Sequence, residues 1–320
     1  MSRLDEIQAR IDARMEEIDQ RVGNGRLEEI QRKADSRLEE IARRIDGGDC
    51  PQGSAAAGGS VRSSAATSAG FAKDAGPYCR RIGLSIGLSK YKQTNDCPGC
   101  VVDATDFAAI LRGAGFETTL LCDAQATRER VTGAIADANS KLMPGDLFVV
   151  AVSGHGARGE VMNPATGRME THEGWCLYDG ELYDAVLVPL FEAFKPGVRI
   201  VVINDQCHAG GMFTVPGVAA APQAVALGFG WARSWYGTSA TAPSLIQLAA
   251  CRAEQTSIGN PIGGTWITAL MKVLAVSREI SWREWFDKAA SHLTLGPGQT
   301  PQWVELGPVT ELFRQGRVLV

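Results

Sequence analysis

Two apolar, β-branched runs that stop abruptly on polar residues and glycine constrain this chain most strongly. Residues 146–152 read Asp-Leu-Phe-Val-Val-Ala-Val, and residues 198–203 read Val-Arg-Ile-Val-Val-Ile. Continuous runs of this kind are typical of strands that are buried on both faces, as in parallel sheets. The first run leads into His155 and the second into Cys207. Ligands and chemistry are placed at the carboxyl edge of such sheets, so we expect both residues at that edge.

A cysteine and a histidine at matching strand ends form a candidate catalytic dyad. The thiolate is the reactive form of cysteine, and an adjacent imidazole can take the thiol proton. We therefore predict Cys207 as the nucleophile and His155 as its acid and base. Glycines flank both residues, which favours the backbone N–H groups of Gly156 and Cys207 as oxyanion donors. Taken alone, either residue could be an inert core thiol or a structural loop histidine, and His208 is interpreted as structural.

The remaining pattern alternates strands with helices and predicts an α/β fold over residues 78–320. Such alternation implies a mostly parallel sheet that helices cover on both faces. The expected elements are strand 80–88, helix 101–113, strand 118–122, helix 127–142, strand 146–152, strand 198–203, strand 245–251 and helix 265–276.

The N-terminal residues 1–46 carry a short repeat of the form Arg-Leu-Glu-Glu-Ile, with copies separated by 11, 12 and 11 residues. Eleven residues make three helical turns, so the apolar stripe stays nearly straight. Gly23-Asn24-Gly25 interrupts it, which predicts a helical hairpin or a coiled-coil segment. This segment could dock on its own catalytic domain, self-associate or bind a helical partner; a membrane-surface helix is least favoured because acids nearly balance bases. Residues 47–77 are rich in Gly, Ala and Ser and are interpreted as a flexible linker.

Composition excludes several function classes. The net charge of −4 leaves no basic excess for a phosphate backbone, so we expect no nucleic acid partner. No segment approaches the roughly 20 apolar residues of a membrane span, and none is typical of a secretory signal. The 8 cysteines are scattered as reduced thiols would be, which favours a cytoplasmic protein.

The motifs around His155 and Cys207 resemble those of the metacaspases and their prokaryotic relatives, within the caspase-like cysteine peptidases. The resemblance covers about residues 80–305 and implies a caspase-like fold with cleavage after Arg or Lys. It also implies that Asp103, Ser153 and Asp205 line the pocket for the basic residue, with Cys100 close by. Converging carboxylates would pair with a guanidinium, although Asp103 could instead cap a helix and Ser153 could serve a turn.

Many metacaspases bind calcium through clustered aspartates, and this chain departs from that pattern. Its candidate acids Glu170, Glu173, Asp179 and Asp184 are spread among apolar residues, and no acid lies between 208 and 232. Calcium sites need several converging oxygens, so we expect no calcium cofactor. The pair Cys97 and Cys100 has zinc-like spacing but lacks a second ligand pair, so we expect no metal there either.

A long segment, 212–243, occupies the position of the linker that is cut during activation of caspase-like peptidases. Arg233 within it, and Arg158 and Arg168 before it, are candidate self-cleavage sites. The sequence thus predicts a cysteine endopeptidase that acts on proteins after Arg or Lys, controlled through residues 1–46 and acting in a death or defence response. The alternative is a catalytically idle scaffold that functions through helix-mediated binding.

Overall fold

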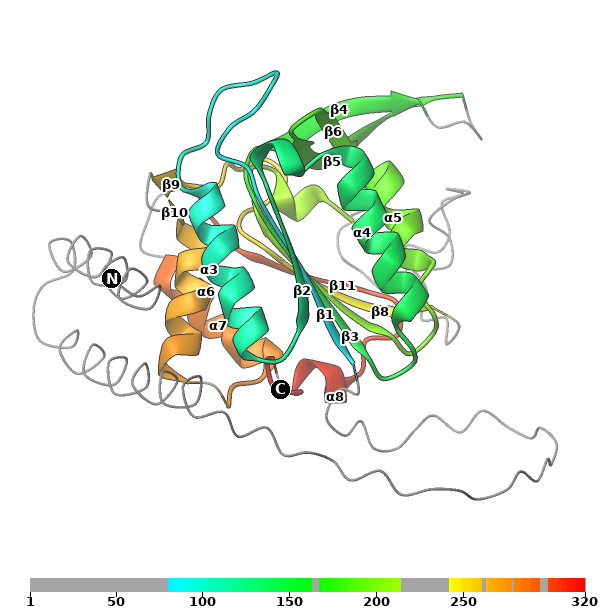
Figure 1. Ribbon diagram of the computed structural model, residues 1–320, viewed down its shortest axis with the longest axis vertical. Coiled ribbons are helices and arrows are strands. Elements are labelled where there is room, and N and C mark those ends of the chain that lie inside the picture. Colours follow the sequence, from blue (N-terminus) through cyan, green and yellow to red (C-terminus); the bar gives the residue numbers. More distant parts are fainter. Residues whose placement is uncertain are drawn as a thin grey trace, which may run out of the picture. The chain divides into compact units, whose positions relative to one another are not determined.

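The part of the chain that the computed structural model describes begins at residue 80 (Figure 1). The described ranges are 80–162, 167–213, 242–260, 263–277, 279–293 and 299–319. The predicted N-terminal helices (1–46), the linker (47–77) and nearly all of the segment 212–243 lie outside these residues. None of the helices described is long and apolar enough to cross a membrane.

The described elements alternate between strands and helices for most of their length. In chain order they are β1 (Arg81–Gly87), α3 (Cys100–Gly113), β2 (Glu117–Cys122), η1 (Asp123–Gln125), α4 (Arg128–Lys141), β3 (Leu147–Ser153), β4 (Gly156–Met162), β5 (Met169–Leu177), β6 (Gly180–Tyr183), α5 (Asp184–Glu192), β7 (Arg199–Asp205), η2 (Ala209–Gly211), β8 (Ser244–Ala249), β9 (Gly259–Asn260), β10 (Gly263–Gly264), α6 (Thr265–Val276), α7 (Trp282–Leu293), β11 (Gln302–Leu306) and α8 (Glu311–Arg314).

A six-stranded sheet with the order β11-β8-β7-β3-β1-β2 forms the centre of the fold. Its strands are parallel except β11, which pairs antiparallel with β8. The two apolar runs that the sequence singles out are β3 and β7, and they are direct neighbours. Because they are parallel, their carboxyl ends meet at one edge of the sheet. The predicted α/β fold with a mostly parallel sheet is confirmed.

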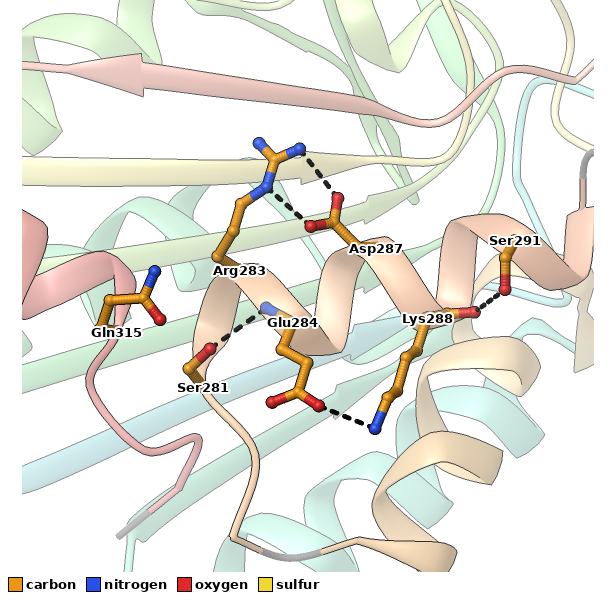
Figure 2. Close-up of a pocket in the computed structure, with 7 residues that line it drawn as sticks. All are labelled: Ser281, Arg283, Glu284, Asp287, Lys288, Ser291 and Gln315. Carbon is orange, nitrogen blue, oxygen red and sulfur yellow. Dashed lines mark hydrogen bonds and ion pairs between the residues drawn. The ribbon is translucent and has the colours of Figure 1, made fainter.

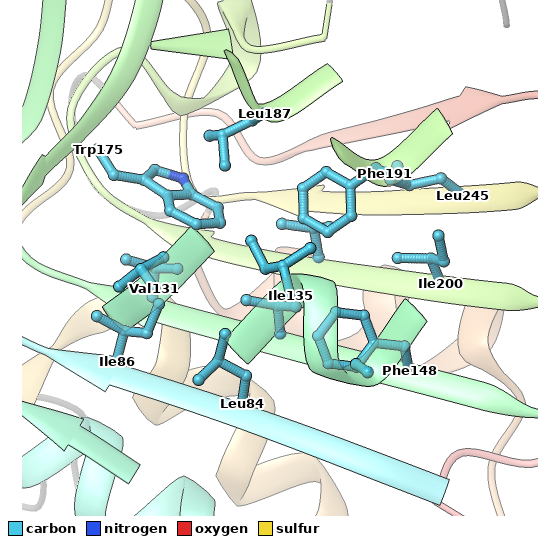
Figure 3. Packing of buried hydrophobic residues seen from close by; sticks show 14 of the residues in the cluster. Leu84, Ile86, Val131, Ile135, Phe148, Trp175, Leu187, Phe191, Ile200 and Leu245 are labelled. Atoms are coloured by element: carbon cyan, nitrogen blue, oxygen red, sulfur yellow. The ribbon is translucent and has the colours of Figure 1, made fainter. Parts of the chain in front are cut away.

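Helices cover both faces of this sheet, and the strands divide their side chains between them. Along β3, Phe148 and Val150 pack with α4 and α5, whereas Val149 and Ala151 pack with α3, α6 and α7. This two-residue alternation is what a strand buried on both faces requires. Figure 3 shows the first cluster, in which Ile135 of α4 and Phe191 of α5 lie over the strands. Among the described residues four tryptophans are fully buried, one in the first cluster and three in the second.

Several parts of the fold were not predicted from the sequence. They include the three-stranded antiparallel sheet β4-β5-β6, the two-stranded sheet β9-β10, the helices α5, α7 and α8, and the antiparallel edge strand β11. The run Gly-Ala-Arg-Gly-Glu-Val-Met of β4 contains two glycines and little apolar alternation, which are weak signals for a strand. Strand β4 is stabilised by its pairing with β5, which runs from Gly156 opposite Trp175 to Met162 opposite Met169. The local sequence does not encode this pairing.

Candidate functional site

The carboxyl ends of β3 and β7 bring His155 and Cys207 to the same edge of the sheet. Ser153 lies opposite Asp205 in the strand register, and each strand then delivers its functional residue two positions later. The backbones beyond the strands touch, because a Cβ added to Gly156 would lie 1.8 Å from the carbonyl oxygen of Cys207. Only glycine fits at 156, since real Cβ atoms are not found so close to backbone atoms.

The loop between β1 and α3 holds His155. The backbone N–H of His155 donates a hydrogen bond to the Tyr91 hydroxyl at 2.7 Å, and the two rings lie 5.0 Å apart between centroids. On the imidazole ring, Nε2 lies 3.0 Å from the carbonyl oxygen of Asn95. The His155 carbonyl accepts from the Gln206 side chain at 3.1 Å and from the Cys176 backbone at 3.0 Å. The orientation of His155 therefore depends on residues from both sides of the sheet edge.

The Cys207 thiol is partly buried at the start of a tight turn. Burial raises its pKa, and the negative charges of Cys97 and Asp205 add to this effect, while hydrogen bonds from the backbone N–H groups of Ser257 and of Cys207 itself lower it. The turn continues through His208, which has a φ of 62° in the left-handed region. A raised pKa means that the thiol is protonated at neutral pH and needs a base to become a nucleophile.

His208 contributes to the turn and not to the dyad. Its Nδ1 lies 2.6 Å from the Ala253 carbonyl oxygen, and its backbone N–H donates to the Gln255 carbonyl at 3.0 Å. These contacts tie the residue after the cysteine to the segment that follows β8, in line with its interpretation as structural.

The acid Asp103 is fully buried one turn into α3. One of its oxygens, Oδ2, accepts from the Ser153 hydroxyl at 2.9 Å and from the backbone N–H of Gly264 at 2.7 Å. Asp103 therefore contacts the end of β3 and the start of α6. At that terminus Gly99 is the capping residue, and no side chain makes the cap hydrogen bond.

Asp205 approaches the same glycine from β7. Its carboxylate accepts from the Ser257 hydroxyl and from the backbone N–H of Ile267 at 2.9 Å, and a Cβ on Gly264 would lie 2.2 Å from Oδ2. Burial raises the pKa of Asp205, and the two hydrogen bonds oppose this effect. The structure thus brings Asp103 and Asp205 together around Gly264, and Ser153, which binds Asp103, joins them at the ends of β3 and β7.

Cys100 lies at the first position of α3, with its thiol beside that of Cys97. The two sulfur atoms are 2.9 Å apart, and both cysteines are free thiols. Cys100 is 5% exposed, and its thiol also interacts with Ser153 and with the charge of Asp103. Cys100 therefore lies near Asp103 and Ser153, and Cys97 lies beside Cys100.

The acids that the sequence considers for calcium have partners within the protein. Asp179 accepts from the Arg128 backbone N–H at 2.8 Å, Asp184 binds His172, and Glu173 lies 3.7 Å from the Arg158 guanidinium. Burial raises the pKa of Glu173 to about 7, and the nearby Asp184 charge adds to the shift. Among the described residues no group of three His, Cys, Asp or Glu is arranged to hold a metal ion.

The candidate self-cleavage sites lie in different surroundings. Arg158 is an exposed residue in the middle of β4, where it pairs with Glu173 of β5. Arg168 is exposed just before β5, and Arg233 falls outside the described residues. A protease binds its substrate as an extended, unpaired segment, so Arg158 would first have to leave its sheet.

A pocket of about 410 Å³ lies elsewhere, along the solvent face of α7 (Figure 2). Its lining is polar, and Arg283 with Asp287 and Glu284 with Lys288 form ion pairs one helical turn apart within it. Exposed pairs of this kind contribute little and indicate a solvated helix surface. None of the candidate site residues lines this pocket.

Several residues of the site could not be predicted from the sequence. Tyr91, Asn95 and Gln206 hold His155, and Ser257 holds Asp205, yet their spacing in the sequence carries no signal of these contacts. The spacing of Cys97 and Cys100 is typical of a metal motif, and it does not indicate that the two sulfurs lie in contact.

The chain is similar in sequence to metacaspases over part of its length. Metacaspase-1B of Aspergillus fumigatus is 28% identical over 43% of this chain and 37% of its own length, and Metacaspase-1A of Neurospora crassa is 27% identical over 43% and 33%. The match therefore spans well under half the length of these relatives.

Solved structures extend the comparison over most of the chain. Protein GSU0716 from Geobacter sulfurreducens has a TM-score of 0.60 at 26% identity, covering 75% of this chain and 98% of its own. Caspase-1 from Spodoptera frugiperda shares the fold, with a TM-score of 0.50 at 12% identity over 77% of this chain and 95% of its own. Residues 80–312 match the Caspase domain family, and the chain belongs to this family of cysteine peptidases.

Proposed function

We propose that this protein is a cysteine endopeptidase that cleaves proteins after Arg or Lys, with Cys207 as the nucleophile and His155 as acid and base. The observation that carries the proposal is the backbone contact between Gly156 and Cys207, which joins the two strand ends. It sets both halves of the dyad beside two buried carboxylates.

The hydrogen bonds of His155 assign its two ring nitrogens different roles in this proposal. A carbonyl oxygen can only accept, so the contact of Nε2 with the Asn95 oxygen puts a proton on Nε2. The neutral ring then carries its lone pair on Nδ1. Because burial raises the pKa of Cys207, the thiol keeps its proton until Nδ1 takes it during attack on the substrate carbonyl. The backbone N–H groups of Gly156 and Cys207 would stabilise the resulting oxyanion.

Specificity for a basic residue follows from the buried acids. Each carboxylate oxygen has more than one acceptor position, so Asp103 and Asp205 can bind a guanidinium in addition to their present donors. A substrate Arg or Lys would add a charge-assisted hydrogen bond to these carboxylates. Ser153 would orient Asp103, and Cys100 would form part of the pocket wall.

Hydrolysis of fluorogenic peptides that end in Arg, Lys or Asp tests this function in the full-length chain, with and without calcium. We expect cleavage after Arg and Lys, and a loss of at least about 1,000-fold in Cys207→Ala. Cys122→Ala is the matched control, since Cys122 ends β2 and takes no part in the site. Asp205→Asn should raise KM for Arg peptides about 10-fold or more while its kcat changes less.

Preference for peptides that end in Asp would contradict the pocket assignment. Equal activity of the wild type and Cys207→Ala would contradict the assignment of Cys207 as the nucleophile. If the wild type cleaves none of the peptides, the protein is better explained as a scaffold that acts through binding.

Control through residues 1–46 and self-cleavage at Arg233, Arg158 or Arg168 are further parts of this proposal. The apolar stripe of the repeat supports a helical partner or self-association. The double variant Ile18→Asp and Ile30→Asp should abolish assembly of the full-length chain, as measured by light scattering, whereas Glu17→Gln should not. Unchanged assembly and unchanged activity in the double variant would argue against this control.

A further inference from the structure

Two thiols that the proposed mechanism does not use lie side by side at the edge of the site. The sulfur of Cys100 donates toward the sulfur of Cys97 across 2.9 Å, and a disulfide needs a sulfur separation of about 2.05 Å. Bond formation thus requires a shift of less than about 1 Å. Gly99, with a φ of 94°, makes the turn that folds Cys97 back over the first residue of α3.

The two cysteines differ in reactivity in the way a dithiol pair requires. The hydrogen bond from Cys100 lowers the pKa of Cys97, and the N-terminus of a helix also favours a thiolate. The same hydrogen bond, together with burial, raises the pKa of Cys100. Cys97 is half-buried and accessible to a small oxidant, whereas Cys100 is covered.

The pair joins the two segments that build the site. Cys97 ends the loop that carries Tyr91 and Asn95, the residues that hold His155. Cys100 starts the helix that carries Asp103. The charge of Cys97 raises the pKa of Cys207, and the charges of Asp103 and Asp205 raise the pKa of Cys97. The Cys97 sulfur therefore interacts electrostatically with the nucleophile and with the pocket acids.

We propose that Cys97 and Cys100 form a reversible redox pair, whose oxidation to a disulfide removes the ionisable thiol of Cys97 from the wall of the basic-residue pocket and weakens its affinity for Arg and Lys. This inference rests on the proposed function of the pocket. It assigns a modification site to two residues that lie outside the dyad, and a hydroperoxide is the oxidant that the pair takes.

The oxidation proceeds in two balanced steps. The Cys97 thiolate attacks a peroxide oxygen; an S–O bond forms, the O–O bond breaks, and the leaving group, hydroxide from hydrogen peroxide or alkoxide from an organic hydroperoxide, takes a proton to become water or the alcohol. The Cys100 thiol then loses its proton, and its sulfur attacks that of Cys97. The S–S bond forms, the S–O bond breaks, and the hydroxide takes the proton to become water. Two thiols lose two electrons in total, and the hydroperoxide gains them.

The test uses the full-length Cys207→Ala chain, so that neither oxidation of the nucleophile nor catalysis interferes. After treatment with hydrogen peroxide, differential alkylation and mass spectrometry should find a Cys97–Cys100 disulfide that a dithiol reduces. Affinity for a fluorescent peptide that ends in Arg should fall roughly three- to ten-fold on oxidation and return on reduction. A peptide that ends in Ala provides the uncharged comparison and should show no such change.

Matched variants separate the pair from other thiols. Adding Cys97→Ser should give the weaker affinity before any oxidation and no further response to peroxide. Cys97→Asp should keep the tighter affinity and also lose the response, while Cys122→Ser should behave like its parent. A disulfide between other cysteines, or a Cys97–Cys100 disulfide without a change in affinity, would overturn the proposal.

Failure of the proposed function gives a different result from failure of the redox pair. A wild type that binds Arg peptides with redox-dependent affinity but hydrolyses none would refute the peptidase activity and leave the redox pair supported. A wild type that hydrolyses Arg peptides with the same KM before and after disulfide formation would refute the redox pair alone.

Discussion

The ends of β3 and β7 lie side by side, yet they present their functional residues by different means. Beyond β3, His155 is held by close backbone packing, because Gly156 touches the carbonyl of Cys207 and a Cβ on Gly154 would lie 2.5 Å from the Tyr91 hydroxyl. Beyond β7, Cys207 enters a turn with a left-handed residue, His208, which hydrogen bonds tie to the segment after β8.

The difference indicates where each half of the site is vulnerable. The histidine side leaves no free volume, so added atoms should disrupt it. The cysteine side depends on hydrogen bonds and on one unfavourable backbone conformation, so it should tolerate small changes at a moderate cost. The predictions below test this contrast, from the largest expected effect to the smallest.

The largest effect should come from Gly156→Ala. The added Cβ would lie 1.8 Å from the oxygen and 2.8 Å from the carbon of the Cys207 carbonyl, so one backbone must move. A displacement of about 1 Å at reacting groups can cost about 100-fold in rate, and we expect a loss of at least that size in kcat/KM. Gly133→Ala is the control, because this exposed glycine of α4 has nothing within 4 Å of a Cβ and should keep full activity. Near-normal activity of Gly156→Ala would show that the histidine side does not depend on close backbone packing.

Tyr91→Phe should have the next largest effect. It removes the hydroxyl that accepts the His155 backbone N–H and leaves that donor without its partner, at a cost of about 1–3 kcal/mol in the free energy of unfolding. We expect kcat to fall about 10-fold with little change in KM, because His155 loses part of its support and the pocket acids do not. Tyr183→Phe, in β6, is the matched control. A change confined to KM would show that Tyr91 acts on the pocket instead.

Glu173→Gln should change how stability depends on pH. Glu173 lies under the cysteine side, where a Cβ on Gly211 would lie 2.5 Å from its carboxyl carbon. Burial raises its folded pKa from 4.5 to about 7, so the folded state holds a proton that the unfolded state releases. The wild type should therefore lose stability as pH rises from about 4.5 to 7, by up to about 2 kcal/mol after allowance for solvent screening.

The variant should lack this loss and should exceed the wild type in stability at pH 8 but not at pH 4. Urea unfolding across this range measures the difference. Glu160→Gln, at an exposed position of β4, should follow the wild type at every pH. Parallel curves for Glu173→Gln and the wild type would contradict the assigned protonation.

The smallest effect should appear at His208. His208→Ala keeps the left-handed backbone and loses the contact with Ala253, at a cost of about 1–2 kcal/mol. His208→Asn should cost less, since asparagine tolerates this conformation better. Both should keep most of the activity, because the ring of His208 contacts the Ala253 carbonyl and takes no part in the proposed dyad. A loss of activity as large as that of Gly156→Ala would mean that the two strand ends do not differ as described.

The sequence by itself determined the central strands and what stands at their ends. Continuous apolar runs such as 146–152 encode burial on both faces through local pattern alone, and the residues that stop them mark the sheet edge. For this reason His155, Cys207 and the α/β class could be predicted without coordinates. The parallel strands of the core could be predicted from the sequence. Strand β4 could not, because its glycines and polar residues carry no such pattern.

Only the tertiary structure decided how the site is held. Asn95 and Tyr91 meet His155 from 60 and 64 residues away, Ser257 meets Asp205 from 52, and Gly264 meets Asp103 from 161. Contacts at such separations depend on how whole elements pack, which local periodicity does not encode. The approach of Cys97 to Cys100 is short in sequence, but the left-handed turn at Gly99 and the burial of α3 bring the two sulfurs together beside the pocket.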